Sequence, residues 1–117
     1  MMEAILRQIV DEYRDLVTAV DTLDLSQEEG VARLKAKLRL FDGSILQVRQ
    51  IWLKGRIEAY SYYWLRSDGA IISGWDNAPH HIEISTFPHH RHTQRGVEAS
   101  QETNLREVLQ FIRRFFG

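Results

Sequence analysis

Hydrophobic residues recur at helical spacing at both ends of the chain. Near the N-terminus they alternate with charged residues and predict an amphipathic helix over residues 1–20, after which residues 21–30 break the period and predict a loop. The hydrophobic members of this first helix are Ile5, Leu6, Ile9, Val10, Tyr13, Leu16, Val17 and Val20. A second helix is predicted to run almost to the C-terminus, with Ser100 as its N-cap and Glu102 in its first turn. Its hydrophobic members are Leu105, Val108, Leu109, Ile112 and Phe115.

Between these helices the pattern changes to a period of two, which is typical of half-buried strands. Small and branched apolar residues alternate with basic residues over 31–40, and the sequence Phe-Asp-Gly-Ser that follows is a hairpin-turn signal. Further strands are predicted over 45–53 and 56–65 and from residue 70, each separated by a short glycine-containing turn. Strands joined in this way pair with their neighbours in the chain, so the sequence predicts an antiparallel meander of four or more strands.

The order of helix, meander and helix predicts an α+β fold in a single domain over residues 1–117. Both helices are expected to pack on one face of the sheet, the face that carries Leu34, Leu38 and Ile84. Phe115 and Phe116 at the C-terminus offer apolar surface for a homodimer.

Residues 75–92, with the sequence WDNAPHHIEISTFPHHRH, contain all five histidines and both prolines of the chain. Asp76 to Pro79 predicts a turn, and the β-branched residues that follow predict a strand over 80–87. In that strand His81 and Glu83 share one face, and Ile82 and Ile84 face the helices. Pro88 places the last three histidines near a margin of the sheet.

Composition narrows the classes of function. The chain has no cysteine, which excludes disulfides and thiolate chemistry, and its net charge is −1, so that attraction to nucleic acid requires a local patch. No stretch has the length of an apolar membrane span. We therefore expect a cytoplasmic protein that does not contact a membrane.

Three interpretations of the histidines are open. The first is structural, with imidazoles that bond backbone carbonyls near the prolines. The second is a metal site formed by His90 and His92, with His81, Glu83 or Asp76 as a third ligand for a divalent ion. The third is metal-independent cleavage of RNA, which requires no cofactor because the 2′-hydroxyl of RNA is its own nucleophile.

In the third interpretation His81 and either His90 or His92 act as acid and base. Glu83 or Asp76 orients an imidazole, and Arg91 binds phosphate. Two further sets of residues could extend a nucleic-acid surface, by binding phosphates and by stacking on bases. They are the basic residues Arg33, Lys35, Lys37 and Arg39, and the aromatic residues Tyr60, Tyr62 and Trp64. Each set has a structural alternative. The basic residues are then a solvated sheet face, and the aromatic residues are part of the core.

The strings WDNAPHH and TFPHHRH, together with the preceding YSYYW and the FDGS hairpin, resemble the TumE family of toxin-like proteins. Members of that family usually carry histidine at the position of Tyr63. The resemblance implies a toxin of a type II toxin–antitoxin system whose partner is a cognate antitoxin protein. Two functions remain open: a ribonuclease-type toxin, and a non-catalytic or metal-binding protein whose histidine surface binds an antitoxin or a nucleic acid.

Overall fold

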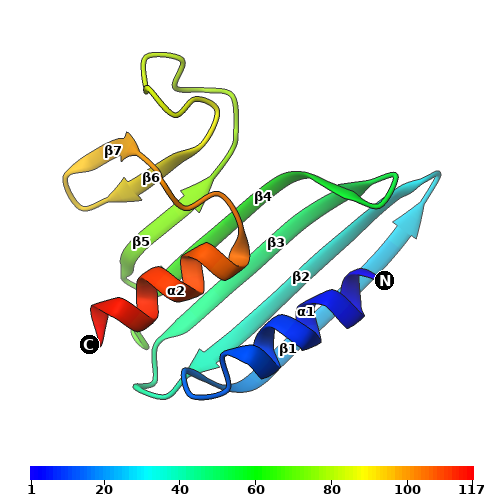
Figure 1. Cartoon of the computed structure of the whole chain (residues 1–117), viewed down its shortest axis with the longest axis horizontal. Coiled ribbons are helices and arrows are strands. Elements are labelled where there is room, and N and C mark those ends of the chain that lie inside the picture. The colour runs from blue at the N-terminus through cyan, green and yellow to red at the C-terminus, as the bar shows by residue number, and fades with distance from the viewer.

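The computed structural model describes residues 1–117, which form a seven-stranded antiparallel sheet and two helices (Figure 1). The strands lie in the sheet in the order in which they occur in the chain, so the predicted α+β meander is confirmed. The elements are α1 (Met2–Glu12), β1 (Val17–Glu28), β2 (Val31–Leu40), β3 (Ile45–Leu53), β4 (Arg56–Leu65), β5 (Ile71–Asp76), β6 (His90–Thr93), β7 (Gly96–Ala99) and α2 (Leu105–Phe115).

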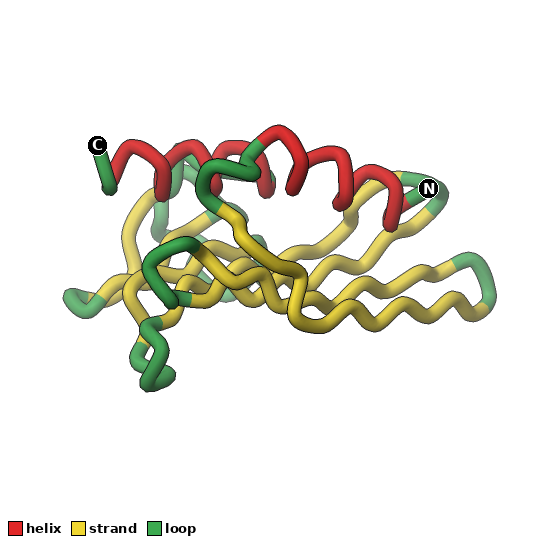
Figure 2. Tube along the Cα trace, turned by 90° about the horizontal axis from the view of Figure 1, so that it is seen from below, coloured by secondary structure: helices red, strands yellow, loops and turns green.

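Both helices lie on the same face of the sheet, as predicted, and no helix lies on the other face (Figure 2). We call these the covered face and the open face. Alternate residues of β2 and β4 are buried beneath the helices, among them Leu38, Tyr62 and Trp64. Two ion pairs join α2 to the residues at the end of α1: Arg106 Nε lies 2.8 Å from Glu12 and Arg113 Nη2 lies 2.6 Å from Asp15.

The N-terminal helix is shorter than its hydrophobic pattern predicts. It ends at Glu12, residues 13–16 form a turn, and Val17–Glu28 forms the edge strand β1, so the prediction of helix over 13–20 and of a loop over 21–28 is wrong. Most of β1 beyond Val20 is exposed on both faces, and the strand is defined by its pairing with β2. Its residues therefore lack the alternation that identifies a half-buried strand.

The predicted strand over 80–87 is also absent. This segment is a series of turns held by local backbone bonds, such as that from Ile84 N–H to the His81 carbonyl at 3.1 Å. Ile82 is 78% exposed and Ile84 lies outside the core, which contradicts their prediction as core residues. The backbone bonds of this segment are local, and strand pairing resumes at β6.

The start of α2 differs from the prediction as well. Asn104, and not Ser100, is the N-cap: its side chain accepts a hydrogen bond from Glu107 N–H at 3.0 Å. Ser100 instead donates to the Glu102 carbonyl. Glu107 is the acidic residue of the first turn, where the helix dipole favours a carboxylate.

The aromatic residues at the C-terminus close one end of the molecule. The Phe116 ring packs against Phe41 at 4.8 Å, and the Phe115 ring against Trp64 at 5.1 Å. Both phenylalanines stay partly exposed, and the homodimer that they suggest stays a prediction. Neither helix has the length and apolar character needed to cross a membrane.

Candidate active site

Three of the candidate residues meet on the open face because of strand register. Asp76 at the end of β5 pairs with His90 at the start of β6, and Gly74 pairs with His92. Partners in register point to the same face of a sheet, and alternate residues of one strand share a face. Asp76, His90 and His92 therefore lie together, and we call them the His–Asp cluster.

The polar atoms of the His–Asp cluster are within contact distance of one another. His90 Nε2 lies 2.9 Å from Asp76 Oδ1, and His92 Nε2 lies 3.0 Å from Asp76 Oδ2. The two Nε2 atoms are 3.1 Å apart. His90 is 2% exposed, whereas the His92 side chain is 31% exposed, so the cluster opens to solvent on the His92 side.

Hydrogen bonding fixes the tautomer of His90. Its Nδ1 lies 2.9 Å from the Pro88 carbonyl, which can only accept, so Nδ1 carries a hydrogen. In a neutral imidazole Nε2 then has a lone pair, and here that lone pair faces the Asp76 carboxylate, which is also an acceptor. The contact becomes favourable when a hydrogen on one of these two atoms, or a bound cation, lies between them.

Tyr63 forms one wall of the cluster. Its ring stacks against His92 with centroids 6.0 Å apart, and its hydroxyl donates to Asp76 Oδ2 at 3.4 Å. Burial, together with the negative charge of Asp76, raises the pKa of Tyr63, so the phenol keeps its proton. The ring lies over Gly74, where a β-carbon would come within 2.3 Å of Tyr63 Cε1. Sequence analysis did not identify Tyr63 or Gly74 as site residues.

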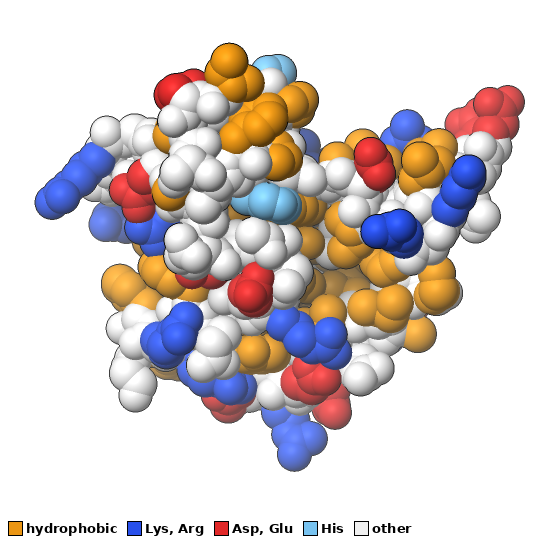
Figure 3. All heavy atoms as spheres, turned by 45° about the horizontal axis from the view of Figure 1, so that its top comes forward, with side chains coloured by type: hydrophobic (Ala, Val, Ile, Leu, Met, Phe, Trp, Pro, Cys, Tyr) orange, Lys and Arg blue, Asp and Glu red, His pale blue; other side chains and the backbone are white.

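His81 and Glu83 lie at the rim of the cluster. His81 Nδ1 is 3.4 Å from Glu83 Oε1, so the predicted pair forms although the strand that was to carry it does not. The His81 ring lies 4.8 Å from that of His90. The turns of residues 77–89 thus bring a third imidazole to the cluster. In the surface view, histidine and hydrophobic side chains gather on this projecting part of the molecule (Figure 3).

The remaining two histidines lie outside the cluster. His89 Nδ1 lies 2.8 Å from the Tyr60 hydroxyl, and His80 is exposed. The structural interpretation therefore fits His89, whose ring also stacks on Tyr60.

Arg91 lies on the covered face, although it stands between the two cluster histidines in sequence. It pairs with Trp75 in register and forms an ion pair with Glu98, and its guanidinium lies 4.9 Å from the Phe111 ring centre. The sheet separates Arg91 from the cluster. It is therefore not placed to bind a phosphate held by His90 and His92, which corrects the prediction.

A strip of basic residues crosses the open face beside the cluster. We call it the cationic strip, and its members, which have no carboxylate partner, are Arg33, Lys35, Lys37 and Arg49. Arg39, which was predicted with them, is paired with Asp21 at 2.7 Å. Sequence analysis missed Arg49, although the alternation of β3 places it opposite Lys35.

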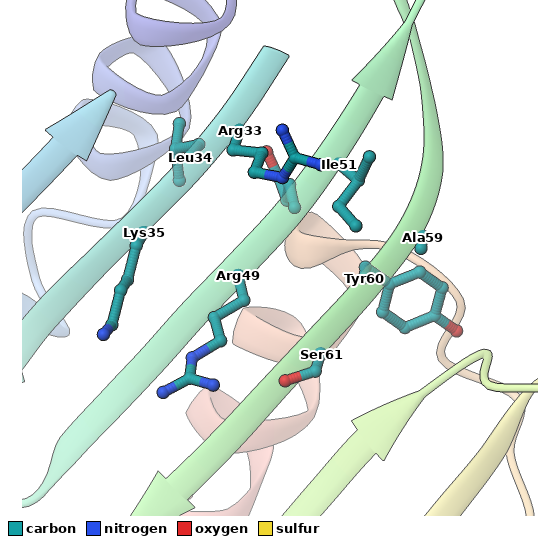
Figure 4. A pocket seen from close by; sticks show the side chains of 9 residues that line it. Arg33, Leu34, Lys35, Arg49, Ile51, Ala59, Tyr60 and Ser61 are labelled. Carbon is teal, nitrogen blue, oxygen red and sulfur yellow. The ribbon is translucent and has the colours of Figure 1, made fainter. Parts of the chain in front are cut away.

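The cationic strip borders a shallow hollow of about 440 Å³ on the sheet surface (Figure 4). Arg33, Lys35 and Arg49 line the hollow with Ser61. Ser61 is the register partner of both Arg49 and Asp76. Neighbouring strands lie about 4.8 Å apart, so roughly 10 Å separates the backbones of Arg49 and Asp76.

The aromatic residues predicted to stack on bases belong instead to the core. Tyr60, Tyr62 and Trp64 are buried on the covered face. Burial raises the pKa of Tyr62 to about 12, against the effect of the hydrogen bond that it accepts from Gln50. Tyr63, on the opposite side of the same strand, is the partly exposed aromatic residue beside the cluster.

Comparison with protein families agrees with the resemblance drawn from the histidine-containing segment. The family model described as toxin TumE matches residues 5–116. No curated protein and no solved structure matches the chain. The matched range includes the whole His–Asp cluster and the cationic strip.

Proposed function

Because this chain belongs to the TumE toxin family, we propose that it acts as the toxin of a toxin–antitoxin system and cleaves RNA on the open face of its sheet. One observation carries the proposal: His81 and the His–Asp cluster gather at one place on that face. RNA cleavage needs groups that transfer protons and a positive charge for the phosphate, and this group of side chains can supply both.

In the proposed reaction His81, oriented by Glu83, accepts the proton of a 2′-hydroxyl. The 2′-oxygen attacks the adjacent phosphorus, and a new P–O2′ bond forms as the P–O5′ bond breaks. The positive charge at the His–Asp cluster stabilises the phosphate oxygens, and the departing 5′-oxygen takes a proton held there. The products are a 2′,3′-cyclic phosphate and a 5′-hydroxyl.

The cationic strip provides a route for the rest of the strand. Its members are exposed, carry no ion pair and lie on the same face as the cluster. Flexible single-stranded RNA could therefore place neighbouring phosphates along Arg49 and Lys35 while one phosphate lies at the cluster. In this proposal Tyr63, which is partly exposed beside the cluster, stacks on a base next to the scissile bond.

The proposed partner is a cognate antitoxin protein that neutralises the toxin. A protein that covers the open face would block both the cluster and the cationic strip. In the non-catalytic alternative the same surface binds the antitoxin or a nucleic acid without cutting it.

The test compares two neighbouring positions on opposite faces of the sheet. Expression of the chain without an antitoxin should arrest growth, and His92→Ala should relieve the arrest and slow RNA cleavage by about 10²- to 10⁴-fold. Arg91→Ala is the matched control, because Arg91 adjoins His92 in β6 but faces away from the cluster. We expect Arg91→Ala to remain toxic and active.

The products should carry cyclic phosphate ends, which end-labelling can detect. Each variant is checked for folding by circular dichroism. Purified protein that leaves RNA intact, or a His92→Ala variant that stays toxic, would contradict cleavage at this site and favour the binding alternative.

A further inference from the structure

We propose that the His–Asp cluster is a metal site, in which His90 Nε2, His92 Nε2 and the carboxylate of Asp76 bind one divalent transition-metal ion. One ligand atom from each residue lies within 4.8 Å of the others. Binding of the ion is independent of RNA cleavage. Its role in the reaction rests on the function proposed above.

The separations between the ligand atoms match those around a single ion. A metal–nitrogen distance is about 2.1 Å, so two Nε2 atoms 3.1 Å apart subtend an angle of about 95° at a common ion. The distances of 2.9 Å from His90 Nε2 to Asp76 Oδ1 and of 3.0 Å from His92 Nε2 to Asp76 Oδ2 correspond to angles of about 90°, so both carboxylate oxygens face the ion. These are the angles between adjacent positions of an octahedron.

The hydrogen bonds around the cluster hold the ligands as a metal requires. A ligating histidine almost always donates its second ring N–H to a carbonyl or a carboxylate, and His90 Nδ1 donates to the Pro88 carbonyl. Asp76 is oriented in the same way, since its Oδ1 accepts from Ala78 N–H at 2.9 Å. These bonds leave the Nε2 atom of His90 and the Asp76 carboxylate directed toward the shared position.

Charge provides an independent argument. Asp76 is buried, and its ion-pair partners are the two histidines, with no lysine or arginine among them. A buried carboxylate is costly unless a positive charge compensates it. A divalent ion supplies that charge, and it lies between the Asp76 carboxylate and the lone pair of His90 Nε2, which would otherwise face each other as two acceptors.

The donor set also indicates which ions fit. Two imidazole nitrogens and one carboxylate group are a ligand set that suits first-row transition ions, whereas magnesium and calcium prefer oxygen ligands. Three protein ligands leave open positions, and the exposed side of the cluster lies at His92 and His81. A bound ion would act as a Lewis acid on a phosphate oxygen, and water on the ion would supply the leaving-group proton.

Calorimetry with Zn²⁺ on the full chain, previously freed of metal with a chelator, tests the site. We expect one Zn²⁺ per chain and no competition from an excess of Mg²⁺. His92→Ala should weaken binding by about 100-fold or more, because even the loss of a residue that only supports a ligand costs 10- to 100-fold. His80→Ala and His89→Ala are the matched controls, since both histidines belong to the same segment and lie outside the cluster, and they should leave the affinity unchanged.

A second measurement needs no variant. Co²⁺ added to the unmodified protein should give the weak visible absorption of a six-coordinate ion, and Zn²⁺ should abolish it. Absence of saturable binding at one site, or loss of binding in His80→Ala but not in His92→Ala, would overturn the inference.

RNA assays separate this inference from the proposed function. A protein that binds Zn²⁺ at the cluster but cuts no RNA keeps the metal site and loses the function. A protein that cuts RNA in the presence of a chelator and binds no Zn²⁺ keeps the function and loses the metal site.

Discussion

The two faces of the sheet are built from the same strands but differ in what covers their side chains. In β5, Trp75 points to the covered face, where its indole N–H donates to Glu102, while the next residue, Asp76, points to the His–Asp cluster. In β6, Arg91 packs on Phe111 while the histidines on either side of it face Asp76. A shift of one residue along a strand thus separates a side chain on the covered face from one in the His–Asp cluster.

This separation predicts where substitutions are tolerated. Side chains on the covered face are held by α1, α2 and one another, so their removal leaves a cavity. The open face has no second layer over β2 and β3, and its side chains end in solvent. The His–Asp cluster is the exception, because residues 77–89 fold over the margin of the open face and bury His90.

The largest expected effect compares two consecutive residues of β2. Leu38→Ala should lower the free energy of unfolding by about 2–5 kcal/mol, because Leu38 is fully buried beneath the helices. Lys37→Ala should change it by no more than about 0.5 kcal/mol, because Lys37 is exposed on the open face. Urea unfolding followed by circular dichroism measures both. A Lys37→Ala variant as unstable as Leu38→Ala would mean that a partner or second copy covers the open face in solution.

Local patterns were sufficient for most of the fold. The alternation of β2, β3 and β4 and the turns between them identified these strands correctly, and the C-terminal helix followed from its apolar spacing. The edge strand β1 was missed because it is exposed on both faces and is defined by pairing with β2. The hairpin of β6 and β7 was missed for a different reason, because a strand of four residues is too short to show a clear alternation.

The site was only partly predictable. The concentration of histidines in residues 75–92 indicated where chemistry would lie, but not which side chains would meet. Asp76 and His92 are sixteen residues apart and come together through the register of β5 and β6. Register also decides which face a residue occupies. Without the register, the sequence pattern placed Arg91 and Tyr62 at the site and did not indicate Tyr63.

The second prediction uses a tyrosine on the covered face. Burial raises the pKa of Tyr62 to about 12, whereas an unfolded tyrosine ionises near 10. The contribution of neutral Tyr62 to the free energy of unfolding is therefore complete below about pH 10 and is lost as the pH rises through about 12. Because the unfolded chain releases its proton first, the free energy of unfolding should fall by up to about 1.4 kcal/mol per pH unit in this window, about 3 kcal/mol in all.

Tyr62→Phe cannot ionise, so its free energy of unfolding should fall less steeply between about pH 10 and about pH 12. The variant should also lose some stability at neutral pH, because Gln50 Nε2 loses its acceptor. Tyr63→Phe is the open-face comparison and should change the slope less, since Tyr63 is only partly buried. Equal slopes in Tyr62→Phe and the unmodified protein would show that the covered face does not hold Tyr62 in its neutral form.

The smallest effect concerns the contact that joins the sheet to the His–Asp cluster. Gly74→Ala would place a β-carbon 2.3 Å from Tyr63 Cε1, so the ring must leave its present position against His92 and residue 74. We expect a loss of about 1–2 kcal/mol in stability, which is typical of overpacking. In a Tyr63→Ala background the same substitution should cost almost nothing, because the ring that it displaces is gone. Urea unfolding of the two single variants and the double variant measures this coupling. Equal costs of Gly74→Ala in both backgrounds would mean that Tyr63 is not seated on Gly74 and does not form the wall of the cluster.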